Sequence, residues 1–116
     1  MTDSRALTHW LPVVGWAALI FALSSIPHLG TDLGTWDLIL RKCAHMTEYA
    51  ILAFLLARAF GREAPALAAG VLYAISDEVH QGFVSGRHAS PIDVAIDTVG
   101  LLLGLLVWRR LVQLNA

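Results

Sequence analysis

Four apolar stretches divide the chain, at about residues 7–26, 38–60, 64–83 and 92–111. Each is close to the ~20 residues that an α-helix needs to cross the hydrocarbon core of a bilayer. The breaks between the stretches contain the expected glycine and proline residues, namely Pro27, Gly30, Gly61, Pro65, Gly86 and Pro91. The pattern therefore predicts one all-α domain over residues 1–116, a polytopic membrane protein built as a bundle of four transmembrane helices.

Composition supports a membrane protein. The chain has 116 residues, of which 57% are hydrophobic and 15% charged, whereas about one quarter of the residues in a soluble domain are charged. The formal net charge of -1 offers no basic surface, which excludes nucleic acid as a partner. The only cysteine, Cys43, cannot form an internal disulfide. We therefore expect a membrane-embedded chain with no nucleic-acid function.

Positive charges indicate the orientation of the four predicted spans. Alternate threading places five arginines on the side that holds both termini: Arg5, Arg58, Arg62, Arg109 and Arg110. The opposite side holds Arg41, Lys42 and Arg87. Because segments rich in Lys and Arg stay in the cytoplasm, we expect a multi-pass protein of the cell inner membrane with both termini cytoplasmic.

Apart from the arginines at the inner ends of the spans, the charged residues within the apolar stretches fall in the outer half of the predicted bundle. Three spans contribute them, together with a tyrosine and an amide: Lys42, His45, Glu48, Tyr49, Asp77, Glu78, His80, Gln81, Asp93 and Asp97. Ionisable groups at membrane depth are costly, so they usually face a protein interior or a hydrated cavity and carry function. The sequence therefore predicts a polar site that opens toward the outer leaflet.

Helical periodicity assigns several of these residues to common faces. At about 100° per residue, Lys42, His45 and Tyr49 fall on one face of the second span. One stripe of the fourth span combines two carboxylates with two glycines: Asp93, Asp97, Gly100 and Gly104. Glycines four residues apart permit close approach of helices, and carboxylates avoid lipid. We therefore expect this stripe to face the second or third helix.

Several short motifs combine these residues in a recognisable order. They are Lys42-x-x-His45-x-x-x-Tyr49, Asp77-Glu78-x-x-Gln81, Gly86-Arg87, Ser90-x-x-Asp93, and Gly100 with Gly104. In order and spacing the chain resembles the VanZ-like family of bacterial membrane proteins. The resemblance implies a small helical protein of the bacterial cell envelope, associated with resistance to the glycopeptide teicoplanin. Asp97 departs from the family pattern, in which many relatives have asparagine.

Two classes of function fit this site. In the first, the protein binds or acts on a lipid or lipid-linked envelope precursor, and two groups of residues take part. The candidate catalytic residues are Asp77, Glu78, Asp93 and His45, as general bases and proton carrier. The candidate substrate-binding residues are Lys42, Tyr49, Gln81 and Arg87, with the two cations on a phosphate. The alternative is a small transporter or channel, or a structural membrane protein whose charges lock the bundle.

The charge balance of the site leaves one question open. Three cations, Arg41, Lys42 and Arg87, face five carboxylates, Glu48, Asp77, Glu78, Asp93 and Asp97. Shared protons, a histidinium, a bound cation or solvation would each balance the excess of negative charge. His45 and His80 belong to no recognised zinc spacing, so the sequence predicts no metal site and assigns no cofactor. A homodimer would supply the second half that a transporter needs.

Overall fold

The structure, a computed structural model, describes residues 4–25, 35–83 and 91–114. Within these ranges the chain forms four α-helices, α1 (Ser4–Ser24), α2 (Thr35–Phe60), α3 (Glu63–Gln81) and α4 (Pro91–Leu114). The prediction of an all-helical fold is thereby confirmed. Each helix covers one of the four apolar stretches of the sequence.

Three of the four helices are long and apolar enough to cross a membrane. Among the described residues these segments are Ala6–Ser24, Ile39–Phe60 and Pro91–Leu114. Helix α3 is not apolar enough to be among these segments, because its last two turns run through the polar segment 76–81. The prediction of four spans is therefore confirmed only in part: the protein is a helical membrane protein, and α3 is shorter and more polar than its neighbours.

Local sequence explains where the helices turn. The N–H of Gly61 donates to the carbonyl oxygen of Ala57 at 2.7 Å, and Gly61 has a φ of 74°. This left-handed conformation is open to glycine without steric cost, so α2 ends there and α3 begins two residues later. Pro91 starts α4, where its missing N–H leaves no helical hydrogen bond unmade.

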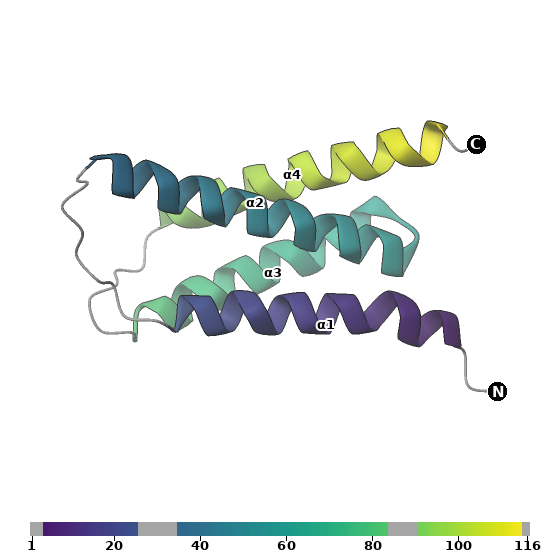
Figure 1. Cartoon of the computed structure of the whole chain (residues 1–116), viewed down its shortest axis with the longest axis horizontal. Coiled ribbons are helices and arrows are strands. Elements are labelled where there is room, and N and C mark those ends of the chain that lie inside the picture. Colours follow the sequence, from purple (N-terminus) through teal and green to yellow (C-terminus); the bar gives the residue numbers. More distant parts are fainter. Residues whose placement is uncertain (1–3, 26–34, 84–90, 115–116) are drawn as a thin grey trace.

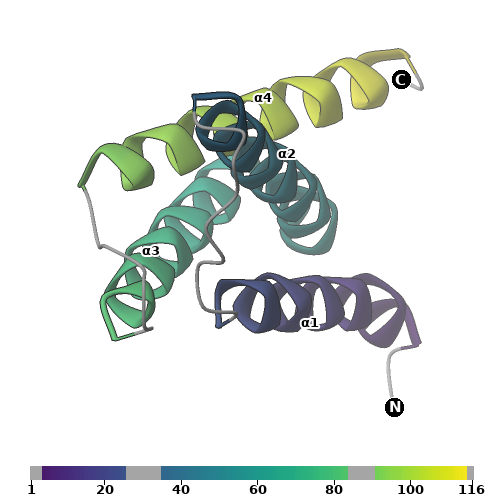
Figure 2. The ribbon, with the colours of Figure 1, turned by 60° about the vertical axis from the view of Figure 1, so that its left-hand side comes forward.

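The helices run alternately in opposite directions (Figure 1). The start of α1, the turn at Gly61 and the end of α4 lie at one end of the molecule (Figure 1). We call the opposite end, where Ser24, Gln81 and Pro91 lie, the cluster end. Helix α2 occupies the centre: it contacts α1, α3 and α4, and its contact with α4 is the most extensive (Figure 2).

The α2–α4 contact depends on the two glycines of the fourth helix. Both are buried, and a Cβ atom added to Gly100 would overlap the carbonyl oxygen of Met46. A Cβ atom on Gly104 would overlap the carbonyl oxygen of Ala50 in the same way. The glycine stripe therefore faces α2, as its spacing predicted, and brings the two backbones into direct contact.

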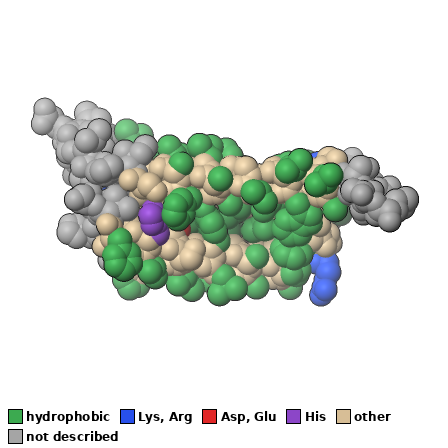
Figure 3. Space-filling model, turned by 90° about the horizontal axis from the view of Figure 1, so that it is seen from below, with side chains coloured by type: hydrophobic (Ala, Val, Ile, Leu, Met, Phe, Trp, Pro, Cys, Tyr) green, Lys and Arg blue, Asp and Glu red, His purple; other side chains and the backbone are tan. Residues whose placement is uncertain are grey.

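Apolar side chains fill the interior beneath the cluster end and also cover the outside. The largest buried ones are Tyr49, Ile20, Leu52 and Leu101. On α4, Leu102, Leu103, Leu106 and Val107 are about half exposed. Hydrophobic side chains lie along the whole face seen in Figure 3. A surface of this kind suits lipid, since lipid tails are as apolar as the side chains themselves.

Candidate functional site: a buried polar cluster

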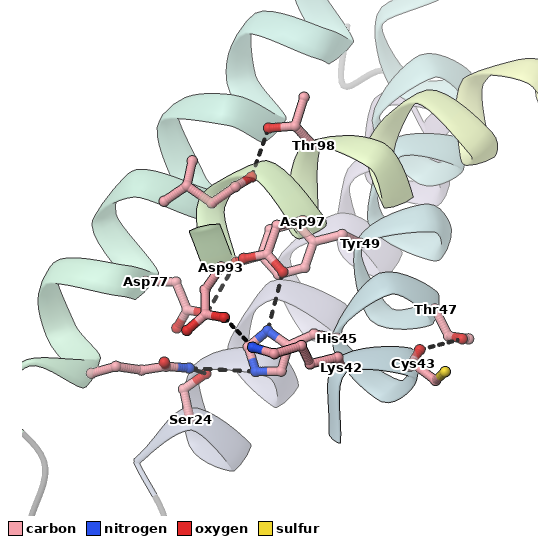
Figure 4. A network of polar contacts seen from close by, with 12 residues as sticks. Ser24, Lys42, Cys43, His45, Thr47, Tyr49, Asp77, Asp93, Asp97 and Thr98 are labelled. Atoms are coloured by element: carbon pink, nitrogen blue, oxygen red, sulfur yellow. Dashed lines mark hydrogen bonds and ion pairs between the residues drawn. The ribbon is translucent and has the colours of Figure 1, made fainter. Parts of the chain in front are cut away.

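Polar side chains from all four helices meet at the cluster end (Figure 4). The polar cluster, as we define it, consists of Ser24 of α1; Lys42, His45 and Tyr49 of α2; Asp77 and Gln81 of α3; Asp93 and Asp97 of α4. Ser24, Asp77, Gln81 and Asp97 are each less than 5% exposed. The cluster therefore combines charge with deep burial at one end of an apolar bundle.

Lys42 and Asp93 form the rim of the cluster. The Nζ of Lys42 donates to Oδ1 of Asp93 at 2.5 Å, linking α2, about two turns from its start, to the first turn of α4. Their side chains remain 37% and 23% exposed, more than the groups beneath them. Within the described residues the pair is therefore the most accessible part of the cluster.

His45 lies one turn further along α2 and joins α4 to α3. Its Nδ1 is 3.1 Å from Oδ1 of Asp97, and its Nε2 is 3.4 Å from Nε2 of Gln81. An ionised carboxylate only accepts and an amide nitrogen only donates, so this arrangement suits a neutral imidazole with its proton on Nδ1. The second amide hydrogen of Gln81 is directed at Oγ of Ser24, 3.5 Å away.

Tyr49 forms the floor of the cluster. Its side chain is fully buried, and its hydroxyl donates to Oδ2 of Asp77 at 3.0 Å. The ring stacks near that of His45, with centroids 6.3 Å apart. Tyr49 thus holds Asp77 in place from α2, while its apolar ring separates the charges from the hydrophobic interior.

Two oxygens in the cluster lack a hydrogen-bond donor. Among the described residues, none donates to Oδ1 of Asp77 or to Oδ2 of Asp97, although both atoms are buried. Leaving a buried polar atom without a partner costs about 1–3 kcal/mol, and more for a charged group. These two carboxylates therefore have capacity for a further ligand.

The remaining candidate residues lie at different distances from this network. Glu78 is buried next to Asp77 on α3. His80 faces away: its ring stacks on Phe21 with centroids 4.1 Å apart, and its Nε2 is 2.9 Å from the hydroxyl of Ser25. Arg87 lies outside the described residues, so its proposed role stays a prediction.

One subset of the cluster has the composition of a metal site. A ring nitrogen of His45 and one carboxylate oxygen each of Asp77 and Asp97 all lie within 4.8 Å of one another. Sequence reasoning missed this group because its members come from three helices and form no local spacing. It also left Asp97 out of the candidate catalytic residues; the available signal was its position one turn after Asp93 on the glycine stripe.

A separate groove lies at the other end of the molecule, between α3 and α4. It has a volume of about 480 Å³, is mostly apolar, and is bordered by the ion pair of Arg109 and Glu63 at 2.6 Å. None of the residues of the polar cluster lines it. Its position and apolar lining suit a lipid chain rather than chemistry, so we assign the functional site to the polar cluster.

A family model described as VanZ/LLP1 matches residues 3–113. The chain belongs to this family. The VanZ/LLP1 match confirms the resemblance seen in the motifs, and it includes every residue of the polar cluster. No curated protein and no solved structure matches the chain. Beyond its family, the function of this VanZ/LLP1 protein is therefore inferred from the geometry of the polar cluster.

Proposed function

We propose that this VanZ/LLP1 protein spans the bacterial inner membrane four times and uses the polar cluster to bind, or act on, a lipid or lipid-linked envelope precursor. The observation that carries the proposal is the burial of charged side chains from several helices at one end of an apolar bundle. Such groups are costly in a membrane and are usually retained for function. The association of VanZ-like proteins with teicoplanin resistance supports a substrate that belongs to the cell envelope.

The length and packing of α3 support its role as a fourth span. Its 19 residues extend over about 28 Å at 1.5 Å per residue, close to the ~30 Å of the hydrocarbon core. The polar side chains Asp77, Glu78 and Gln81 are buried against other helices rather than exposed to lipid. Arg58, Arg62, Arg109 and Arg110 gather at the end opposite the cluster, which favours cytoplasmic termini and a cluster that faces outward.

An anionic head group is the ligand that the rim of the cluster suits best. The ammonium of Lys42 is partly exposed and already holds a carboxylate of Asp93, so a phosphate of the ligand can compete for the same donor. Arg87 follows α3 closely along the chain, and its planar guanidinium suits bidentate binding of phosphate. Tyr49 and Gln81 then position the head group from beneath with neutral hydrogen bonds.

The deeper residues supply chemistry if the bound lipid is turned over. Asp77 has one oxygen that receives no hydrogen bond within the described part of the chain, and it is the first candidate general base, with Asp93 and Glu78 as the other carboxylates. The neutral imidazole of His45 accepts a proton on Nε2 and releases one from Nδ1 toward Asp97. These roles require a ligand within hydrogen-bond reach of the carboxylate, so lipid binding is the step to test first.

A purely structural role is the main alternative. The Lys42–Asp93 pair does join α2 to α4 and would fix their register. Against a role limited to locking the bundle, Asp77 and Asp97 each have a buried oxygen to which none of the described residues donates. A transporter or channel shares the binding step of our proposal and would then move the bound molecule across the membrane.

The proposal is tested by identifying the lipid that stays bound. We would extract the protein from bacterial membranes in lipid-retaining nanodiscs and compare its lipids by mass spectrometry with those of empty nanodiscs. We expect an anionic lipid, such as a polyprenyl phosphate, to be enriched at least about fivefold. Lys42→Gln should abolish the enrichment, while Arg58→Gln, which removes an exposed cation at the opposite end, should keep it.

The same variants give a cellular readout. Expression of the wild-type protein and of Arg58→Gln should reduce teicoplanin susceptibility, and Lys42→Gln should not. No enriched lipid in the wild-type sample, or an equal enrichment in Lys42→Gln, would show that the cluster does not recognise an anionic head group.

A further inference from the structure

We propose that His45, Asp77 and Asp97 form a binding site for one divalent transition-metal ion, Zn²⁺ or Mn²⁺. The three side chains come from α2, α3 and α4, the helices that meet at the cluster end. A site of this kind joins three helices through a single ion. Metal binding at these residues does not depend on lipid binding, because the distances and burial that support it involve no lipid.

The spacing of the donor atoms suits a metal ion. One ring nitrogen of His45 and one oxygen from each aspartate lie within 4.8 Å of one another. Two ligand atoms bound to Zn²⁺ at about 2.1 Å are at most ~4.2 Å apart. Three atoms bound to one ion at this length average no more than ~3.6 Å apart, so the widest separation must contract by roughly 1 Å. Rotation of the three side chains can supply a movement of this size.

Unmet hydrogen-bonding capacity points to the same ligand. Asp77 and Asp97 are 2% and 1% exposed, and Oδ1 of Asp77 and Oδ2 of Asp97 have no donor among the described residues. The other oxygen of Asp77 accepts a hydrogen bond from the hydroxyl of Tyr49, whereas the His45 nitrogen that lies 3.1 Å from Oδ1 of Asp97 would exchange this contact for the ion. Metal-binding carboxylates are commonly oriented in this way by hydrogen bonds from the surrounding protein.

Charge also favours a dication. Lys42 already pairs with Asp93. Asp77 and Asp97 are contacted instead by the hydroxyl of Tyr49 and the imidazole of His45. Two ionised carboxylates buried together are strongly unfavourable unless they are paired. One divalent ion supplies two positive charges. It would balance the excess of two carboxylates over cations that was counted in the sequence.

The donor set narrows the identity of the ion. One imidazole and two carboxylates form a mixed nitrogen and oxygen set, whereas Mg²⁺ and Ca²⁺ prefer oxygen ligands alone. A thiolate is absent from the group, and Cys43 is exposed, which argues against Cu⁺. Three protein ligands leave at least one coordination position for water or for an oxygen of a bound head group.

Metal content of the purified protein tests the site directly. The protein would carry an affinity tag without histidine, be treated with chelator in detergent, loaded with Zn²⁺ or Mn²⁺, and desalted before elemental analysis. We expect about one ion per chain. His45→Gln and Asp97→Asn should lower the bound metal at least about fivefold. His80→Gln and Glu63→Gln, which remove an imidazole and a carboxylate outside the group, should retain it.

A second measurement avoids dependence on variants that fold poorly. Zn²⁺ or Mn²⁺ should raise the melting temperature of chelator-treated wild-type protein by several degrees, and Mg²⁺ at the same concentration should not. Neither measurement uses added lipid. Metal binding can therefore be found even if no lipid is enriched, and lipid enrichment can be found even if no metal binds. A wild-type protein with less than about 0.2 ion per chain, or equal loss of metal in all four variants, overturns the inference.

Discussion

The contact between α2 and α4 makes a sharp prediction for Gly104→Ala. A Cβ atom at this position would lie 2.8 Å from the carbonyl carbon of Ala50 and 2.9 Å from its Cα, besides overlapping the carbonyl oxygen. Carbon atoms normally pack about 3.5–4.0 Å apart and the overlap with the oxygen is tighter still, so the helices must separate by roughly 1 Å or more. The obstacle is backbone, and no rotation of a side chain can relieve it.

The expected cost of Gly104→Ala is set by two opposing effects. Overpacking of a close contact costs typically about 1–3 kcal/mol. Alanine in place of glycine within a helix returns about 0.5–1 kcal/mol. We therefore expect the free energy of unfolding to fall by about 1–2 kcal/mol. Separation of α4 from α2 should also lengthen the contact between His45 and Asp97, so any metal or lipid bound at the polar cluster should be held more weakly.

Gly15→Ala is the matched control. Gly15 is a helical glycine in α1, and a Cβ atom there would meet nothing within 4 Å, so this variant should be unchanged or slightly more stable. Both variants can be compared with wild type by reversible unfolding in mixed detergent and SDS micelles, followed by tryptophan fluorescence. If Gly104→Ala proves as stable as Gly15→Ala, the backbones of α2 and α4 do not lie in contact and the reasoning fails.

Two further predictions concern the floor of the cluster and the orientation of the chain. Tyr49→Phe removes the donor to Asp77, so the free energy of unfolding in the same assay should fall by about 1–2 kcal/mol; no change would mean that Asp77 does not depend on this hydrogen bond. For topology, a cysteine at Ser85 should react with an impermeant reagent on intact cells and a cysteine at Arg62 should not, both in a Cys43→Ser background. Labelling of position 62 alone would show that the orientation is inverted.

The fold was largely predictable because its main determinants are local. Helix length, glycine at the α2 terminus and proline at the start of α4 can each be seen in the sequence, and the structure has a helix for each apolar stretch. The spacing of Gly100 and Gly104 predicted a helix contact with the second or third helix, and the structure shows that the partner is α2. What the apolar pattern did not decide was whether the third stretch, with the polar residues of its last turns, is long and apolar enough to span a membrane.

For the site, the sequence predicted the depth of each residue in the bundle and the helical face on which it lies, but not its partners. Alternate threading placed Lys42, His45 and Asp93 at one end, and the structure brings them together there. It could not tell that Lys42 pairs with Asp93 while His45 pairs with Asp97, because that choice depends on the rotation and crossing of α2 against α4. Helical periodicity placed His80 on a different side of α3 from Asp77, and its contacts with Phe21 and Ser25 depend on how α3 packs against α1.

The order in which the chain is made gives the α2–α4 pairing a further consequence. The partner of Lys42 is synthesised 51 residues later, and that of His45 52 residues later. During synthesis α2 therefore leaves the ribosome with two polar groups whose partners on the last helix do not yet exist. Since unpaired polar and charged groups are poorly tolerated in lipid, we expect α2 to reach its final depth only after α4 has entered the membrane. Insertion is completed by the final helix, and truncation before α4 should leave a chain that the cell's quality control removes.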